Sequence, residues 1–304
     1  FKFREQWNRL KSYVNEKGLK FIGDIPLYVA MDSSDVWVHR DLFELDEDCE
    51  PVHIAGVPPD AFSDDGQRWG NPLYRWDVME EQDFEWWCER MKANASLYDV
   101  IRIDHFIGIV NYWSIAADCP TAIDGEWKKG PGEKLMRAIL PVIGDAGIIA
   151  EDLGVLTKPV KDLIRKLGFP GMKIIEFGLD CAPDNDYLPH NYSTSNTVAY
   201  IGTHDNETLA GFLNGCKRAQ LAKIKAYFGA RTAKDLADKI IRSLFACVAD
   251  VAIVQTQDLL GLDNAARTNL PSTVGQNWRW RATKEQLSGI DTAYYRELCR
   301  MYNR

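Results

Sequence analysis

The sequence contains no long apolar run and no block of basic residues. Its most apolar stretch, Leu244 to Val254, is short and is interrupted by Asp250, whereas a membrane-spanning helix needs roughly 20 apolar residues. Lys and Arg are scattered, and the formal net charge is −8. Nucleic acid and membrane surfaces are therefore not expected as partners, and a neutral ligand suits the composition better.

Paired cysteine motifs are also missing. The seven cysteines are isolated from one another, and no two of them form a C-x-x-C pair. An odd number of scattered cysteines is typical of reduced thiols and does not indicate a disulfide framework or a zinc site. The sequence also shows no signal-peptide pattern. Together these features predict a cytoplasmic protein.

Several common catalytic and cofactor motifs do not occur. No apolar run leads into a G-x-G-x-x-G or Walker-type loop, which weighs against a nucleotide-binding fold. No G-x-S-x-G elbow is present, so a serine nucleophile is poorly supported. The five histidines form no H-x-H or H-E-x-x-H pair, so we do not expect a catalytic metal.

What is present is an alternation of amphipathic segments with short apolar runs. Segments with helical periodicity cover residues 1–18, 83–98, 132–147 and 157–168, and another begins at Ala233. The apolar runs are "LKFIGDIPLYV", "DVIRIDHF", "IIAEDLG", "MKIIEFGL", "TVAYIGTHDN" and "DVAIVQTQDLLG". This alternation predicts a parallel sheet with helical crossovers. Nearly continuous apolar strands suit a sheet that is covered on both faces.

Two architectures fit this pattern, a (β/α)8 barrel and a doubly wound open sheet, and the missing glycine-rich loops favour the barrel. Two long connections, residues 57–77 and 267–281, look non-helical and are rich in aromatic residues. Connections of this length are usually functional or disordered, and the aromatic content favours function. We predict one catalytic barrel over residues 1–304, with loop insertions at 50–80 and 264–282.

Carboxylates follow three of the apolar runs, at Asp104, Glu151 and Asp205. Any one of them alone could be a helix cap or part of a structural ion pair. Three in succession at predicted strand ends indicate a shared site, because the carboxyl ends of parallel strands meet at one edge of a barrel. Other polar residues at these ends are Asp24, Arg102, His105 and His204.

Converging carboxylates have a chemical use. Like charges that share a site push the pKa values of the carboxyl groups apart, so that one stays ionised while another holds a proton. Glycoside chemistry needs such a pair. Arg102 precedes Asp104 by two residues, which places both on one face of a strand. Arg102 could therefore keep Asp104 ionised, although a purely structural salt bridge would use the same geometry.

The aromatic residues of the two long connections allow two interpretations. They can pack in the core or at its rim, or they can stack on the apolar faces of sugar rings. Trp69 is the best placed for stacking, because it lies between Gly and Pro residues in its segment. The other aromatic residues considered are Tyr74, Trp76, Trp278 and Trp280.

Six segments, in order, resemble one enzyme family. They are "GDIPLYVAMDSSDVW", "GVPPDAFSDDGQRWGNPLY", "IRIDHFIGIVNYW", "IIAEDLG", "YIGTHDNETL" and "RTNLPSTVGQNWRWR". Together they resemble the 4-α-glucanotransferases of glycoside hydrolase family 77, also known as amylomaltases or disproportionating enzymes. The resemblance extends from about Phe21 to the C-terminus.

The resemblance implies an α-amylase-type (β/α)8 barrel without a cofactor. Such enzymes transfer a segment of an α-1,4-glucan or maltooligosaccharide to the 4-hydroxyl of an acceptor glucose or glucan, with retention of configuration. By resemblance, Asp104 is the nucleophile, Glu151 the general acid/base and Asp205 the third carboxylate. Retention predicts that the carboxyl groups of Asp104 and Glu151 lie about 5–5.5 Å apart. Substrate contacts are implied for Asp24, Trp69, Arg102, His105, His204 and Asn269.

Two departures from the family are visible. The chain begins at Phe1, within a predicted helix, and Asp24 corresponds to the third barrel strand of the family. We therefore expect the first two strands to be missing and an N-terminal segment to belong to the complete protein. Some family members also have a tyrosine where this chain has Ala61. The alternatives are an α-glucan hydrolase, a remnant that only binds glucan, and a metal-dependent barrel hydrolase.

Overall fold

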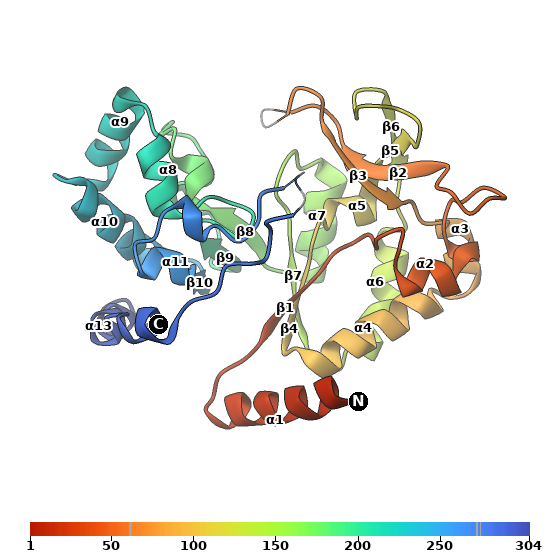
Figure 1. Cartoon of the computed structure of the whole chain (residues 1–304), viewed down its shortest axis with the longest axis horizontal. Coiled ribbons are helices and arrows are strands. Elements are labelled where there is room, and N and C mark those ends of the chain that lie inside the picture. Colours follow the sequence, from red (N-terminus) through yellow and green to blue (C-terminus); the bar gives the residue numbers. More distant parts are fainter. Residues whose placement is uncertain (61–62, 272, 274) are drawn as a thin grey trace. The chain divides into compact units, whose positions relative to one another are not determined.

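The computed structural model describes residues 1–60, 63–271, 273 and 275–304. The chain divides into two compact units, Phe1–Pro170 and Gly171–Arg304, each of which is described by itself (Figure 1). Ala61, the position of the second departure noted in the sequence, lies outside the described residues. The single barrel over residues 1–304 stays a prediction.

The first unit is built on a parallel sheet of three short strands. They are β1 (Ile22–Ile25), β4 (Val100–Ile103) and β7 (Gly147–Ala150), in the order β1-β4-β7. Each contains isoleucine, and β-branched side chains pack well in a strand. The register pairs Asp24 with Arg102, and Arg102 with Ile149. The sheet therefore brings polar side chains of neighbouring strands to the same level.

Helices with apolar faces accompany this sheet. They are α1 (Lys2–Glu16), α2 (Ser34–Val38), α3 (Trp76–Glu81), α4 (Glu85–Leu97), α5 (Ile107–Val110), α6 (Glu133–Ile139) and α7 (Lys158–Leu167), with the 3-10 turns η1 (Arg40–Leu42) and η2 (Leu140–Val142). Helix α4 buries Trp87 and Met91, and α6 buries Leu135 and Met136, all in one core. The helices predicted over 83–98 and 157–168 are thus confirmed as α4 and α7.

A second, antiparallel sheet was not predicted. It consists of β2 (His53–Val57), β3 (Gln67–Pro72), β5 (Asn111–Ala116) and β6 (Gly125–Lys129), in the order β3-β2-β5-β6. The prediction that residues 57–77 are non-helical is wrong only for the start of α3 at Trp76, and strand β3 within this segment was not foreseen. The sequence of β3, QRWGNP, contains residues that strands disfavour, and its backbone is held by pairing with β2.

The second unit is also built on three parallel strands, β8 (Gly171–Ile174), β9 (Thr197–Tyr200) and β10 (Val251–Ile253), in the order β10-β9-β8. Its helices are α8 (Leu209–Gly215), α9 (Arg218–Phe228), α10 (Ala233–Ala246), α11 (Thr256–Leu259), α12 (Lys284–Ser288) and α13 (Thr292–Met301), with the 3-10 turns η3 (Ile175–Gly178), η4 (Pro189–Asn191) and η5 (Asn264–Ala266). Its core includes Ile201, Leu236, Ile240 and Leu244.

Each of the six apolar runs therefore overlaps a parallel strand that is shorter than the run, and β7 and β8 begin one residue before their runs. Strand β1 ends before Pro26, which has no N–H for a sheet hydrogen bond. Strand β8 ends at Ile174, and the rest of "MKIIEFGL" turns into η3. Within the described residues, none of the helices has the length and apolarity to cross a membrane.

Candidate active site

Two carboxylates lie at the C-terminal ends of strands in the parallel sheet of the first unit. Asp104 follows β4 and Glu151 follows β7. The backbone N–H of Asp104 donates to Ile25 O at 2.9 Å, and that of Glu151 donates to Ile103 O at 3.1 Å. The sheet hydrogen bonding therefore continues through both residues, and the position of each carboxylate is fixed by the backbone that carries it.

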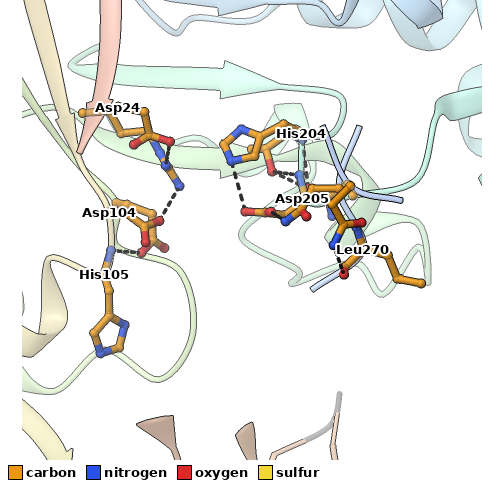
Figure 2. A network of polar contacts seen from close by, with 12 residues as sticks. Asp24, Asp104, His105, His204, Asp205 and Leu270 are labelled. Carbon is orange, nitrogen blue, oxygen red and sulfur yellow. Dashed lines mark hydrogen bonds and ion pairs between the residues drawn. The ribbon is translucent and has the colours of Figure 1, made fainter. Parts of the chain in front are cut away.

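The guanidinium group of Arg102 joins two carboxylates. Its Nη1 lies 2.5 Å from Oδ2 of Asp24, and its Nη2 lies 3.1 Å from Oδ1 of Asp104 (Figure 2). Burial alone would lower the pKa of Arg102, but the carboxylates of Asp24 and Asp104 outweigh it and raise that pKa above its usual value. The ion pair between Arg102 and Asp104 that the two-residue spacing allows is present, and it fits both interpretations left open by the sequence. A permanent cation beside Asp104 favours its ionised form.

Glu151 lies in a different environment, since its residue is only 7% exposed. Its Oε2 accepts a hydrogen bond from His105 N at 2.7 Å, and its Oε1 accepts one from Leu153 N at 2.7 Å. Burial raises the pKa of Glu151 to about 8 and the charge of Asp104 acts in the same direction, while Arg102 and the two N–H donors oppose them. The raised pKa therefore favours the protonated carboxyl group near neutral pH.

His105, whose N–H binds Glu151, has a left-handed backbone conformation. Its φ of 51° lies in the left-handed region, which non-glycine residues seldom adopt. The imidazole packs edge-on against Trp69, with ring centroids 4.8 Å apart, and is tilted toward Tyr28 at 6.3 Å. Burial lowers the pKa of His105 to about 4. The lowered pKa therefore favours the uncharged imidazole at neutral pH.

A cavity lies beside these groups in the first unit. It measures about 220 Å³ and is lined by Pro26, Leu27, Tyr28, Trp69, Asn71, Asp104 and His105. Trp69 thus lies next to the nucleophile candidate, as sugar stacking would require. Tyr74 and Trp76 are buried in the core instead, so packing is the correct interpretation for those two residues.

The second unit contains the remaining predicted site residues. Asp205 follows β9, and its Oδ1 accepts a hydrogen bond from Nδ2 of Asn269 at 2.6 Å. Its Oδ2 lies 3.3 Å from Nε2 of His204 (Figure 2). Arg267 donates to the carbonyl oxygens of Asp205 at 2.6 Å and of Asn269 at 2.8 Å. The structure thus brings His204, Asp205 and Asn269 together.

An exposed aromatic ring lies over this second group. Trp278 is 64% exposed, and its ring centroid lies 5.0 Å from that of His204. Its backbone N–H donates to Thr268 O at 2.8 Å. Among the loop aromatics proposed for stacking, Trp69 and Trp278 are therefore the two that lie beside predicted site residues, while Trp280 is partly buried.

A family comparison identifies the chain. The model of glycoside hydrolase family 77, described as 4-alpha-glucanotransferase, matches residues 1–287. The chain belongs to this family. It is 46% identical to a 4-alpha-glucanotransferase of Clostridium butyricum, over 100% of this chain and 63% of the relative. It is 43% identical to a 4-alpha-glucanotransferase of Thermus thermophilus, over 94% of this chain and 58% of the relative.

Solved structures of family 77 enzymes agree. The amylomaltase of Streptococcus agalactiae in complex with acarbose superimposes with a TM-score of 0.94 at 45% identity, over 99% of this chain and 61% of that one. The amylomaltase of Corynebacterium glutamicum shares the fold, with a TM-score of 0.76 at 17% identity, over 90% of this chain and 44% of that one. The predicted TIM-barrel-type α/β fold is confirmed. The chain spans 58% to 63% of the length of the two curated relatives named above.

Some polar residues near the predicted site residues were missed by sequence reasoning. Glu176 and Asp258 are buried carboxyl groups of the second unit, 7% and 5% exposed. Glu176 follows an apolar run, as Asp104 and Glu151 do, so the signal that predicted those two was available for it as well. Asn71 of the cavity was not predicted, because an asparagine in a Gly- and Pro-containing segment looks like an ordinary turn residue.

Proposed function

We propose that this protein is a 4-α-glucanotransferase. In this proposal it transfers a segment of an α-1,4-glucan to the 4-hydroxyl of an acceptor glucose or glucan by a retaining double displacement. The observation that carries the proposal is the pair formed by Asp104 and Glu151. Asp104 is ion-paired with Arg102, whereas burial raises the pKa of Glu151 to about 8. One carboxyl group is thus suited to attack and the other to proton donation.

The first displacement breaks the donor bond. Glu151 donates its proton to the glycosidic oxygen while a carboxylate oxygen of Asp104 attacks the anomeric carbon. The bond between that carbon and the glycosidic oxygen breaks, and the departing glucan leaves with a new 4-hydroxyl group. The retained segment stays bound to Asp104 as a glucosyl ester, and Glu151 is left ionised.

The second displacement uses a new acceptor. Ionised Glu151 takes the proton from the 4-hydroxyl of the incoming sugar, whose oxygen attacks the anomeric carbon and releases the Asp104 carboxylate. Two inversions at the same carbon give net retention. Both residues return to their starting protonation states, so the cycle needs no cofactor.

The other site residues are assigned to binding in this proposal. Asp205, with its partners His204 and Asn269, holds hydroxyl groups of the reacting sugar. Arg102, which Asp24 anchors, holds the Asp104 carboxylate in place. His105, as a neutral ring, and Trp69 contact the sugar in the cavity.

Transfer requires that an acceptor sugar compete with water. The aromatic rings of Tyr28 and Trp69 line the cavity. Trp69 and Asn71 belong to β3, the strand at one edge of the antiparallel sheet. Holding the acceptor there raises its effective concentration and displaces water. A hydrolase would use the same carboxylates with water as the acceptor, so the carboxylates alone do not separate the two activities.

Two further proposals concern the setting of this chemistry. We propose that residues 1–304 belong to one catalytic barrel, which the family membership and the six parallel strands support. We also propose a cytoplasmic location, which the seven free thiols support.

The test is incubation with maltotriose, followed by separation of the products by size. Transfer gives glucose together with maltopentaose and longer chains. Glucose and maltose without longer products would show that water is the acceptor and that the protein is a hydrolase. Retained binding of maltooligosaccharide without any product would favour a protein that only binds glucan, and sensitivity to EDTA would favour the metal-dependent alternative.

Variants make this assay specific for the proposed pair. Asp104→Asn should abolish product formation, because an amide is a poor nucleophile and a poor leaving group. The matched control is Asp184→Asn, which removes an exposed carboxylate of the second unit and should leave the rate unchanged. A near-normal rate for Asp104→Asn would refute the assignment of the nucleophile.

A further inference from the structure

A buried carboxyl group of the second unit has no role in the mechanism above. Glu176 lies in η3, just after β8, and is 7% exposed. Its backbone N–H donates to Ile201 O at 3.0 Å. This bond extends the pairing of β8 with β9 beyond the pair Ile174–Tyr200. Glu176 is therefore fixed beside the carboxyl end of β9, where the chain enters the turn that carries His204 and Asp205.

The side chain of Glu176 packs against the backbone at Gly202. A Cβ atom at position 202 would lie 3.1 Å from Cδ and 3.1 Å from Oε1 of Glu176. The same Cβ would also lie 2.9 Å from Cβ of Asn206. Gly202 is thus needed for the close approach of its neighbours, and the carboxyl group of Glu176 forms one wall of that contact.

The residues after Gly202 form a hydrogen-bonded turn. Oδ1 of Asn206 accepts from both the N–H and the hydroxyl group of Thr203, each at 2.9 Å. The Thr203 hydroxyl oxygen in turn accepts from Asp205 N at 3.3 Å. A shift of Gly202 or Asn206 would therefore move the backbone of Asp205, and with it the carboxylate that binds Asn269.

The surroundings of Glu176 disfavour a negative charge. The groups that face it are Asp258 on α11, Glu207 after the turn, Arg267 after η5 and Cys216 after α8. Among the described residues, Oε1 of Glu176 and Oδ2 of Asp258 are buried without a hydrogen-bond partner. Burial raises the pKa of Glu176 to about 9, and Asp258 and Glu207 act in the same direction against Arg267.

We propose that Glu176 is a positioning residue that serves as an uncharged carboxylic acid beneath the turn carrying His204 and Asp205. Its neutral form packs on Gly202 without placing a second unpaired charge near Asp258. Ionisation at high pH would put that charge into a buried site and displace the turn. The link to catalysis rests on the proposed transferase function, whereas the charge state of Glu176 does not depend on it.

The first test compares two substitutions at neutral pH. Glu176→Gln keeps the size and the neutral charge of the acid, so maltotriose transfer should stay within about twofold of the unchanged protein. Glu176→Ala removes the wall against Gly202, and kcat should fall by about tenfold or more, since small displacements of active-site groups have large effects on rate. Glu285→Gln, an exposed glutamate in α12, is the matched control. Full activity of a folded Glu176→Ala variant would overturn the proposal.

The second test uses the pH profile of the rate ratio between Glu176→Gln and the unchanged protein. Titration of Glu151 is common to both proteins and cancels in the ratio. The ratio should stay constant at neutral pH and rise by up to about tenfold per pH unit above about pH 9, where only the unchanged protein acquires the charge. A flat ratio up to about pH 10.5 would overturn the proposal.

Two readouts do not need activity and separate this inference from the proposed function. The pKa of Glu176 is raised from 4.5 to about 9 in the folded chain, so folding binds a proton and stability falls as pH rises between those values. Glu176→Gln lacks this loss, so its Tm advantage should grow with pH and level off above about pH 9. The imidazole NMR signal of His204 should also shift near this pH in the unchanged protein and not in Glu176→Gln.

If maltotriose is not converted but both effects appear, the proposed function fails and the inference of an uncharged Glu176 stands. Unfolding of Glu176→Gln at neutral pH, or absence of both effects, would refute it.

Discussion

Asp24 and Arg102 are register partners on neighbouring parallel strands, and Oδ2 of Asp24 lies 2.5 Å from Nη1 of Arg102. The other nitrogen of the same guanidinium group, Nη2, lies 3.1 Å from Asp104. Asp24, on the neighbouring strand, therefore anchors the guanidinium group that binds the proposed nucleophile Asp104. This geometry depends on a planar group with several donors, which a lysine ammonium does not provide.

The substitution Arg102→Lys should lower kcat/KM for maltotriose by about 100-fold, because a point charge on a flexible stem cannot bind Asp24 and Asp104 together. Kinetics together with circular dichroism would check this, since the protein should stay folded. Arg165→Lys, in an exposed ion pair on α7, is the control and should change nothing. An unaltered kcat/KM for Arg102→Lys would show that Arg102 has only a structural role.

Glu151 predicts an alkaline limit to the reaction. It must be protonated to act as an acid, so the rate of the first displacement should fall as pH rises through about 8, by about tenfold per pH unit. Measuring kcat/KM for maltotriose against pH would show this alkaline decrease. A donor with an activated aryl leaving group needs no proton, so the rate of its first displacement should not decrease in this pH range and should be retained in Glu151→Gln. The same alkaline decrease for both donors would contradict the role of Glu151.

His105 predicts an acid-side dependence of stability. Burial lowers its pKa from 6.5 to about 4, so the unfolded chain binds more protons than the folded chain between these values. Stability should therefore rise with pH across this interval and level off above about pH 6.5. The rise of Tm with pH should be smaller in His105→Gln than in the unchanged protein. The control is His190→Gln, which removes an exposed histidine and should keep the full rise. The same rise in both variants would place the titrating group elsewhere.

Gly108 predicts a steric effect on the same histidine. A Cβ atom at this position would lie 2.5 Å from Cδ2 of Leu27 and 2.8 Å from Cδ2 of His105. Gly108→Ala should therefore lower the free energy of unfolding by about 1–3 kcal/mol and weaken glucan binding. Gly215→Ala is the matched control, because a Cβ there meets no atom within 4 Å. Chemical denaturation compares the two, and equal stability would contradict the crowding at Gly108.

The parallel strands and several helices could be predicted from the sequence because their signals are local. Apolar runs such as Ile148 to Ala150 and the helical pattern of α7 are complete within a few residues. The antiparallel strand β3 could not be predicted, because its backbone is held by hydrogen bonds to β2 rather than by its own residue types. Its Trp69 was selected for its position among Gly and Pro residues, and not because a strand was foreseen.

The sequence indicated which residues to consider for the candidate site, but it did not indicate their ion pairs or their pKa shifts. Strand-end position indicated Asp104, Glu151 and Asp205, since that signal requires only the sequence. The bridge from Arg102 to Asp24 depends on the register between two strands, which is a tertiary property. The elevated pKa of Glu151 depends on burial. Glu176 shows the same limit, because its position was visible and its burial was not.

The two hydrogen bonds that hold the Glu151 carboxyl group come from main-chain N–H groups, at His105 and Leu153. Every residue except proline has such a donor. The acid can therefore keep its position while the side chain at residue 153 varies, and a saturation library at that codon should yield active variants of many chemical types. Proline is the substitution that such a library should lack.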